Sequence, residues 1–161
     1  AVRVDGRLLT ESPAICLWVA EHYPDAALAP PAGTLARAEL YRWLCFVQSE
    51  LEQPLWTMAK HSLALPRRYR VPAVLESAQY EFGVAAAILA EALQGRDYLV
   101  GDGFSVADVL AAQTIAWARA AEAPLEHAEL DRYAERMLAR PALTRARQRE
   151  QGALDERATP S

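Results

Sequence analysis

The chain opens with the stretch Val2-Arg3-Val4-Asp5-Gly6-Arg7-Leu8-Leu9-Thr10-Glu11-Ser12-Pro13. Residues 2–10 predict two short strands joined by a two-residue type I′ turn, because Asp-Gly tolerates the positive φ angles that this turn requires. A hairpin of two strands is only marginally stable in water, so these strands require a larger sheet. No other segment of the 161 residues has the pattern of a strand. The sequence therefore predicts an α+β fragment, the end of an α/β domain, followed by an all-α domain.

The hairpin leads into a helix start that carries the first functional candidate. Ser12 is predicted as the N-cap and Pro13 as the first helical residue. Glu11 and Ser12 would then bring a carboxylate, a hydroxyl and free backbone N–H groups to one point. The helix N-terminus suits a carboxylate and Glu11 suits an ammonium group, so the pair fits the headgroup of an α-amino acid. The alternative is a helix cap beside an exposed glutamate.

Composition excludes several classes of partner. The net charge is −4, so the chain has no electrostatic footprint for nucleic acid or for an anionic membrane. No apolar run approaches the roughly 18 residues of a membrane-spanning helix, and no signal peptide opens the chain. Cys16 and Cys45 lie in predicted helices among apolar neighbours, which predicts two core thiols and no disulfide framework. A cytoplasmic location is therefore expected.

The remainder of the chain divides into a linker and a helical domain. Residues 25–33, with the adjacent Pro30 and Pro31, show little periodicity and predict a linker. Thr34 is predicted to cap a long helix, in which Pro54 should produce a kink or a break. The predicted units are 1–24 for the end of the first domain, 25–33 for the linker, 34–150 for the helical domain and 151–161 for a flexible tail.

A local signature marks the helix at the centre of the helical domain. Ser105 and Asp108 have the spacing of a capping box, and the apolar residues on nearly all sides of the following helix predict that it is buried. Asp108 could instead be a catalytic acid or base, but the structural role is the favoured interpretation. Two shorter helices are predicted at about 130–139 and 142–148, and the polar tail from Gly152 is predicted to be disordered.

Histidine and tryptophan supply the remaining candidates for a site. The three histidines are dispersed without ligand spacing, so no metal site is predicted. The four tryptophans have helical spacings, which favours positions in the core. Among them Trp56, next to Pro54, is the best candidate to line an apolar pocket.

Taken together, these pieces resemble the glutathione S-transferase family across nearly the whole chain. The motifs that carry the resemblance are Asp-Gly at 5–6, L-x-E-S-x-A-I at 9–15, Tyr-Pro at 23–24, F-S-x-A-D at 104–108 and Arg-Pro at 140–141. The resemblance implies that the β-hairpin and first helix end a thioredoxin-like domain. It also implies that the remainder is the C-terminal helical bundle of the family.

The resemblance implies an activity for the complete protein. It would be a glutathione transferase that conjugates the thiol of glutathione, its co-substrate, to an electrophilic small molecule, with Glu11 and Ser12 binding the γ-glutamyl end. The family's catalytic Tyr, Ser or Cys would precede Ala1, so none is assigned here, and this chain alone is expected to be nearly inactive. The alternatives are a non-catalytic binding or interaction module of the same fold, and a glutathione-dependent isomerase or disulfide reductase. No metal, nucleic acid or membrane partner is expected.

Further roles follow from the resemblance for the long helix that begins at Thr34. With Phe46 and Trp56 it would line the pocket of the second substrate, and it would form the interface of a homodimer. Glu50 would reach the glutathione of the partner subunit. Glu52 stands where the bacterial beta class has a histidine, which is a departure from that class.

Overall fold

The computed structural model describes residues 1–158, with side chains to residue 155. Its strands are β1 (Val2–Val4) and β2 (Arg7–Leu9). Its α-helices are α1 (Ser12–His22), α2 (Leu35–Phe46), α3 (Gln53–Ala59), α4 (Val74–Ala92), α5 (Val106–Ala120), α6 (Ala128–Leu138) and α7 (Pro141–Ala158). Shorter 3₁₀-helices are η1 (Pro24–Ala26) and η4 (Arg67–Tyr69), and π-helical segments are η2 (Val47–Glu52) and η3 (Lys60–Ala64).

The N-terminal hairpin forms as predicted. β1 and β2 pair antiparallel, with Val2 opposite Leu9, and within residues 1–158 they make up a sheet of two strands. The turn residues Asp5 and Gly6 have φ angles of 46° and 79°, the signs that a type I′ turn requires. The right-handed twist of the strands favours this turn, so the local sequence alone specifies the hairpin register.

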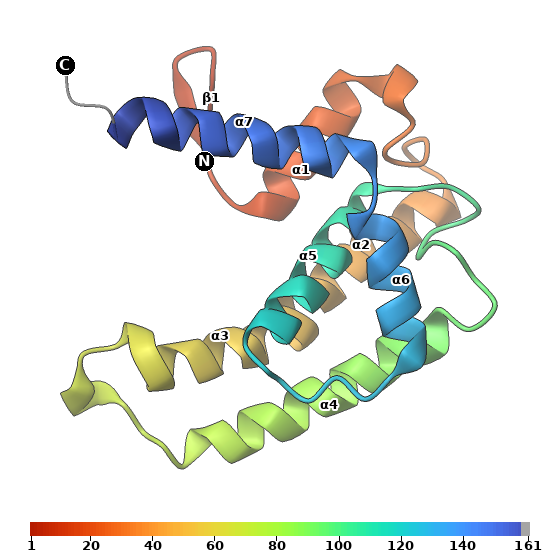
Figure 1. The fold of residues 1–161 in the computed structure, drawn as a ribbon. Coiled ribbons are helices and arrows are strands. Elements are labelled where there is room, and N and C mark those ends of the chain that lie inside the picture. Colours follow the sequence, from red (N-terminus) through yellow and green to blue (C-terminus); the bar gives the residue numbers. More distant parts are fainter. Residues whose placement is uncertain (159–161) are drawn as a thin grey trace.

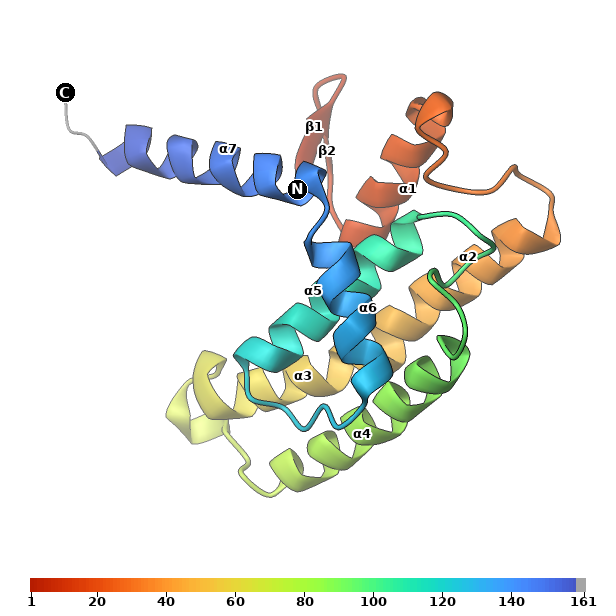
Figure 2. The ribbon, with the colours of Figure 1, turned by 45° about the vertical axis from the view of Figure 1, so that its right-hand side comes forward.

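The helical domain packs around α5 (Figure 1). The rod made of α2, η2 and α3 lies along α4, α6 covers another side of α5, and α1 packs on α5 from the side of the hairpin. α7 extends from the end of α6 and projects away from the bundle, as both ribbon views show (Figure 2). The largest buried side chains of this core include Leu40, Trp43, Phe82, Leu89, Ile115 and Leu130.

The proline in the long helix changes its winding without ending it. Pro54 has no backbone N–H and cannot complete the ordinary helical hydrogen bond. The turn immediately before it is the π-helical segment η2, and Gln53 keeps right-handed helical angles, so the rod continues into α3. The expected kink therefore takes the form of a widened turn, which is a common response to a disturbed helix.

The linker is held against the helical domain. The carbonyl of Leu28 accepts a hydrogen bond from the backbone N–H of Val106, the first residue of α5, at 2.9 Å. The buried side chain of Arg37 donates to the carbonyl of Pro30 at 2.7 Å and pairs with Glu21 of α1 at 2.8 Å. Thr34 caps α2 as predicted, because its hydroxyl accepts from the N–H of Arg37. Three segments are thus tied together at one guanidinium.

The predicted end of the chain is wrong in its secondary structure. α7 continues past Gln148 and Gly152 to Ala158, where a disordered tail was expected. Arg, Glu, Gln and Ala dominate this segment and are good helix formers, and Gln151 donates to Asp155 at 2.8 Å one turn later. The last three residues of the predicted tail, 159–161, lie outside the described residues.

Cys45 is the second correction, because it is exposed where a core position was expected. The buried stripe of α2 runs through Trp43 and Leu44. One residue further along a helix points about 100° away, so Cys45 faces outward. Cys16 is half-buried, and both cysteines are free thiols. Trp56 also departs from the expected core pattern, with 46% of its surface exposed.

Candidate functional site

The start of α1 is displaced by one residue from its predicted position. Glu11, not Ser12, is the N-cap, because its carbonyl accepts the first helical hydrogen bond from the N–H of Ile15 at 3.0 Å. Ser12 is the first helical residue and Pro13 follows it within the first turn. The Glu11 side chain makes no capping hydrogen bond, and among residues 1–155 the Ser12 hydroxyl makes no hydrogen bond. It is therefore available to a ligand.

The backbone of Glu11 is in an unusual conformation. Its φ and ψ angles are 66° and 114°, in the region that favours glycine. Such a conformation costs a residue with a side chain roughly 1–3 kcal/mol, and strain of this kind concentrates at functional sites. Both Glu11 and Ser12 are exposed, and within residues 1–158 no hydrogen-bonding partner is found for the Glu11 carboxylate or the Ser12 hydroxyl. The strained turn thus holds two adjacent, exposed polar residues.

The local chemistry suits a ligand that carries both charges. The first N–H groups of a helix lack partners within the helix and attract anions. The carboxylate of Glu11 precedes them directly and attracts cations. A zwitterionic headgroup could therefore place its carboxylate at the N-terminus of α1 and its ammonium at Glu11.

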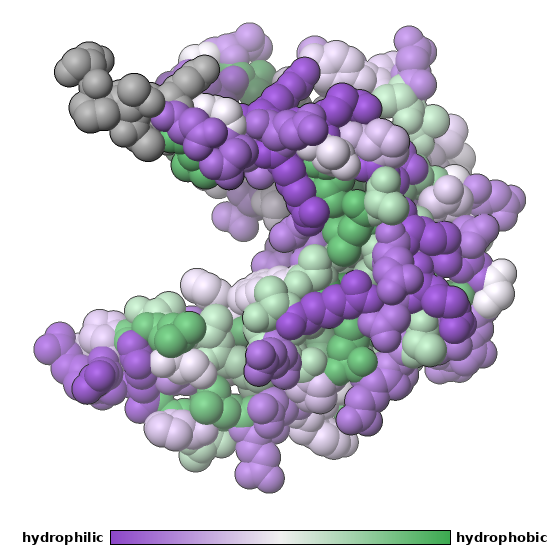
Figure 3. All heavy atoms as spheres, in the orientation of Figure 1, coloured by the Kyte–Doolittle hydropathy of each residue, from purple (hydrophilic) through white to green (hydrophobic). Residues whose placement is uncertain are grey.

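A large apolar cavity begins at this helix start. It has a volume of about 490 Å³ and lies between α1, α5 and the junction of α6 with α7. Ser12 and Cys16 contribute from α1, and burial raises the pKa of the Cys16 thiol. In the space-filling view, hydrophobic side chains gather where α7 meets α5, and the surface is hollowed between α7 and the α3 end (Figure 3).

The residues expected at the second-substrate pocket and the dimer interface fall in two places. Phe46 and Glu50 line a groove of about 300 Å³ between the long rod and α4, and Glu50 accepts from the hydroxyl of Ser49 at 2.9 Å. Trp56 is not among the residues that line this groove. Its ring instead lies 6.2 Å from that of Trp117 on α5, a residue that lines a separate cavity of about 390 Å³.

The Asp108 side chain accepts four hydrogen bonds at the start of α5. It is fully buried and accepts from the N–H of Ser105 at 2.8 Å, from the Ser105 hydroxyl at 3.0 Å and from the N–H of Leu99 at 3.0 Å. The phenol of Tyr133 adds a fourth bond at 2.8 Å. The capping box is thus confirmed. Sequence reasoning missed Leu99 and Tyr133, because neither has a local spacing to Asp108.

Burial explains why the Tyr133 phenol stays protonated. This side chain has 1% of its surface exposed. Burial, and then the neighbouring Asp108 carboxylate, raise the pKa of Tyr133 well above its usual value, because both disfavour the phenolate. Tyr133 is therefore a neutral phenol that donates its hydrogen bond to the buried Asp108 carboxylate. This arrangement suits a structural role, since both oxygens of the acid already accept hydrogen bonds from the protein.

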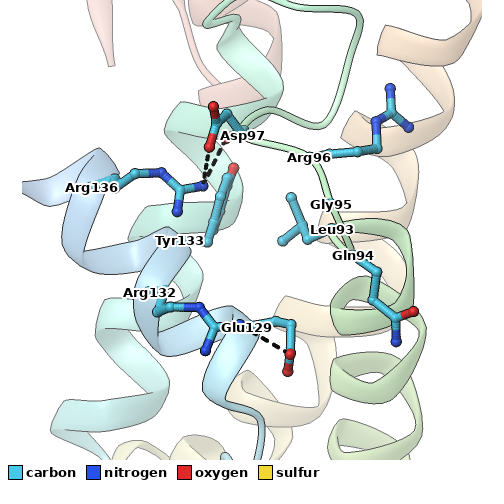
Figure 4. Close-up of a pocket in the computed structure, with 9 residues that line it drawn as sticks. All are labelled: Leu93, Gln94, Gly95, Arg96, Asp97, Glu129, Arg132, Tyr133 and Arg136. Atoms are coloured by element: carbon cyan, nitrogen blue, oxygen red, sulfur yellow. Dashed lines mark hydrogen bonds and ion pairs between the residues drawn. The ribbon is translucent and has the colours of Figure 1, made fainter.

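A separate pocket with charged walls lies between the end of α4 and α6 (Figure 4). Its volume is about 370 Å³. Arg136 pairs with Asp97 at 3.3 Å and Arg132 pairs with Glu129 at 3.1 Å, so much of its charge is already compensated. None of its lining residues belongs to the predicted site.

Two other kinds of site are absent from the described part of the chain. Across residues 1–158, no group of three or more His, Cys, Asp or Glu side chains is placed to hold a metal ion. Within the same residues, no helix has both the length and the apolar character needed to cross a membrane.

Comparison with known proteins assigns the family. The family model of the glutathione S-transferase C-terminal domain matches residues 52–141, more than half of the chain. Glutathione S-transferase GstA of Escherichia coli O157:H7 is 30% identical over 85% of this chain and 65% of its own length. Glutathione S-transferase GST-4.5 of Xanthomonas campestris is 29% identical over 84% of this chain and 67% of its own length. The chain thus spans about two thirds of the length of these relatives.

Solved structures agree with this assignment. A ternary complex of BphK, a bacterial glutathione S-transferase, has a TM-score of 0.83 with 28% identity, covering 93% of this chain and 72% of that one. A sphingomonad glutathione S-transferase complexed with glutathione has a TM-score of 0.81 with 30% identity over the same shares. The family model, the relatives and the fold agree, and we conclude that this chain belongs to the glutathione S-transferase family.

Proposed function

We propose that this chain is part of a glutathione transferase and that Glu11 and Ser12 form its subsite for the γ-glutamyl end of glutathione. The observation that carries the proposal is the strained backbone of Glu11 at the N-terminus of α1, where both side chains are exposed and find no partner among residues 1–155. The complex of the sphingomonad relative with glutathione supports the choice of ligand.

The γ-glutamyl end of glutathione is an α-amino acid headgroup. Its carboxylate accepts from the Ser12 hydroxyl and from the first N–H groups of α1, and its ammonium pairs with Glu11. These contacts bind and orient the tripeptide. They do not activate its thiol, and we assign that step to no residue of this chain. In the reaction, the glutathione thiolate would form a carbon–sulfur bond with an electrophilic small molecule. The attacked carbon would either lose a leaving group together with its electron pair or, in an addition, give up one bond of a double bond, whose electron pair then takes up a proton.

We place the electrophilic substrate at the cavity beside Trp117. This cavity is lined mainly by apolar side chains, among them Met58 on α3 and Leu63 on η3. Trp56 lies against Trp117 and extends the aromatic surface. An apolar, aromatic electrophile suits this lining, since aromatic rings pack well edge-on or offset against one another.

We also propose that the α4 face forms a homodimer. Tyr80, Val84 and Ile88 follow one another at intervals of four residues and expose 74%, 44% and 46% of their surfaces. All three line the groove that contains Phe46 and Glu50. A continuous exposed apolar stripe of this kind marks an interaction surface. A second copy would cover it and bring Glu50 to the boundary between subunits.

Calorimetric titration tests the glutathione subsite. Glutathione is compared with the dipeptide Cys-Gly, which lacks the γ-glutamyl group. We expect glutathione to bind more tightly, and Glu11→Gln to remove about tenfold of that preference, because a hydrogen bond to a charged group contributes roughly 1.5–3 kcal/mol. Ser12→Ala should act in the same direction. Glu76→Gln, at an exposed position on α4, is the matched control.

The result that contradicts the subsite is equally specific. If Glu11→Gln and Glu76→Gln bind glutathione as the unaltered chain does, Glu11 has no role in recognition. Equal affinities for glutathione and Cys-Gly would lead to the same conclusion.

A further inference from the structure

The segment that joins α3 to α4 has a charge distribution unlike that of the rest of the chain. From residue 53 to residue 75 the sequence contains no acidic residue. The same stretch contains four cationic side chains, those of Lys60, Arg67, Arg68 and Arg70. The whole chain has a net charge of −4, so the sum over all residues hides a locally basic segment.

Three of these cations are left without a counter-charge. Among residues 1–155, no ion pair and no side-chain hydrogen bond involves Lys60, Arg67 or Arg68. Arg67 and Arg68 are exposed, and the central guanidinium carbon of Arg68 lies 4.8 Å from the centroid of the exposed Tyr69 ring. The segment therefore presents positive charge that the described part of the protein does not compensate.

Large apolar side chains are exposed in the same segment. Leu63, Tyr69 and Val71 have 78%, 56% and 48% of their surfaces exposed. Both ribbon views place the segment at one end of the molecule (Figure 1 and Figure 2). At this end the space-filling view shows hydrophobic and hydrophilic side chains next to one another (Figure 3). We call residues 60–71 the basic tip.

Hydrogen bonds within the basic tip hold it in a defined shape. The guanidinium of Arg70 donates to three carbonyls between residues 62 and 65, at 2.6 to 2.7 Å. Nδ1 of His61 accepts from the backbone N–H of Val71 at 3.0 Å. These bonds join the beginning of the tip to its end. The exposed side chains are therefore presented by a preformed turn, which lowers the entropic cost of binding.

We propose that the basic tip docks on the surface of an anionic lipid bilayer. The negative surface potential of such a bilayer attracts Lys60, Arg67 and Arg68, and each cation near the surface contributes roughly fivefold to affinity. Leu63 and Tyr69 enter the interfacial region, where a tyrosine ring and its hydroxyl are both well accommodated. With so few anchoring side chains, the docking is peripheral and reversible.

A bilayer fits this tip better than an acidic protein does. The buried core of a protein interface is depleted in charged residues, whereas the apolar side chains of the tip lie among cations in sequence. At a bilayer surface, long cationic side chains stay at the level of the headgroups while their apolar neighbours enter the interface. The tip lines no part of the groove proposed for the homodimer, so docking requires neither that contact nor the glutathione subsite.

Co-sedimentation of the 161-residue protein with sucrose-loaded vesicles tests the docking. Vesicles of phosphatidylcholine alone are compared with vesicles of equimolar phosphatidylcholine and phosphatidylserine. We expect partitioning onto the mixed vesicles to be stronger by about tenfold or more, because three cations at roughly fivefold each exceed that factor. The preference should disappear at high salt, which screens the attraction between exposed charges.

Two double variants separate the tip from the overall charge. Replacing Arg67 and Arg68 by Gln should weaken partitioning onto the mixed vesicles by roughly 25-fold, at roughly fivefold for each cation. Replacing Arg145 and Arg149 by Gln makes the same change of net charge at exposed positions on α7, and this control should bind as the unaltered protein does.

The variant Tyr69→Ser tests the apolar contribution. It should weaken binding to the mixed vesicles and leave their advantage over phosphatidylcholine in place, because all of the cations remain. Thermal unfolding checks that each variant is folded. If the Arg67 and Arg68 variant does not fold, the salt dependence in the unaltered protein tests the same charges.

Four results would overturn the proposal. They are equal partitioning onto both kinds of vesicle, absence of binding to either, and equal losses in the tip variant and the α7 control. The fourth is binding of soluble poly-glutamate that is as strong as binding to the mixed vesicles and is unaffected by Tyr69→Ser. That last result would identify an acidic polypeptide as the partner of the basic tip.

Discussion

Tyr133 donates a 2.8 Å hydrogen bond from its phenol to Oδ1 of Asp108, across 25 positions of sequence. This bond joins the middle of α6 to the first turn of α5. The same oxygen accepts a hydrogen bond from the N–H of Leu99, so the loop before α5 is also held by this carboxylate. A single buried carboxylate therefore holds two helices and a loop together.

Removing the Asp108 carboxylate should strongly destabilise the folded protein. Asp108→Ala leaves the N–H groups of Ser105 and Leu99 and the phenol of Tyr133 without their acceptor in a buried environment. Each unsatisfied buried donor costs about 1–3 kcal/mol, so we expect a loss of about 3 kcal/mol or more in the free energy of unfolding, measured by urea denaturation. Asp102→Ala, at an exposed position, is the control. An unchanged melting temperature with lost ligand binding would instead indicate a functional role for Asp108.

The phenol of Tyr133 alone should contribute less to the free energy of unfolding than the Asp108 carboxylate does. Tyr133→Phe keeps the ring in the core and removes only the donor, while Asp108 still accepts from Ser105 and Leu99. We expect the free energy of unfolding to fall by about 1.5–3 kcal/mol, the usual range for a hydrogen bond to a charged group. Loss of less than about 0.5 kcal/mol in the same urea titration would show that the bond is energetically neutral.

The raised pKa of Tyr133 predicts a pH dependence in alkali. The unfolded phenol ionises near its ordinary pKa of 10.0, whereas the folded one stays protonated to higher pH. Above about pH 10 the folded state therefore binds more protons, and stability must fall as pH rises. The contribution is fully present below pH 10 and decreases by at most about 1.4 kcal/mol per pH unit above it. Urea midpoints measured from pH 9 to 11 should fall less steeply for Tyr133→Phe, and parallel curves would contradict the assignment.

In the ion pair between α1 and α2, removing Arg37 should destabilise the protein more than removing Glu21. Arg37 is buried and also donates to the carbonyl of Pro30, whereas the Glu21 side chain is 57% exposed. We expect Arg37→Leu to cost about 2 kcal/mol, since it leaves a carbonyl without its donor. Glu21→Gln should cost less than about 1 kcal/mol, as exposed ion pairs do. Thermal unfolding of both variants makes the comparison, and a larger loss for Glu21→Gln would contradict it.

The proposed homodimer predicts a change of mass with one substitution. Val84→Glu places a charge at the centre of the apolar stripe on α4, where two copies would face each other with like charges. We expect sedimentation to show a dimer for the unaltered chain and a monomer for Val84→Glu. Val71→Glu, at a similarly exposed valine before α4 that lines none of the cavities described above, is the control and should remain dimeric. A monomeric unaltered chain would exclude this interface at the concentrations measured.

Local sequence predicts the features whose physical cause is local. Asp5 and Gly6 adopt the positive φ angles of the type I′ turn because their own chemistry allows them. Ser105 and Asp108 form the capping box because three residues of helix bring them together. The family motifs are runs of adjacent residues, so the family could also be identified before the fold was known.

The candidate site at Glu11 and Ser12 is predictable only in part, because some of its features depend on tertiary packing. Glu11 and Ser12 are neighbours in sequence, and their position at a helix start could be expected from Ser-Pro alone. The one-residue shift of the N-cap and the strained φ of Glu11 depend on how the hairpin enters α1. The separation of Phe46 from Trp56 depends on the sides of the rod that they occupy, Phe46 before the π-helical turn and Trp56 after it.

What the sequence by itself determined is therefore the N-terminal hairpin, the helical character of the remainder, the caps at Thr34 and at Ser105–Asp108, and the family. Only the tertiary structure decided which distant groups meet: Tyr133 with Asp108, Arg37 with Glu21 and Pro30, and Arg140 over Phe104 beside an apolar cavity. The reason is physical. Turns and caps are set by hydrogen bonds within a few residues, whereas burial and long-range contacts depend on how the helices pack together.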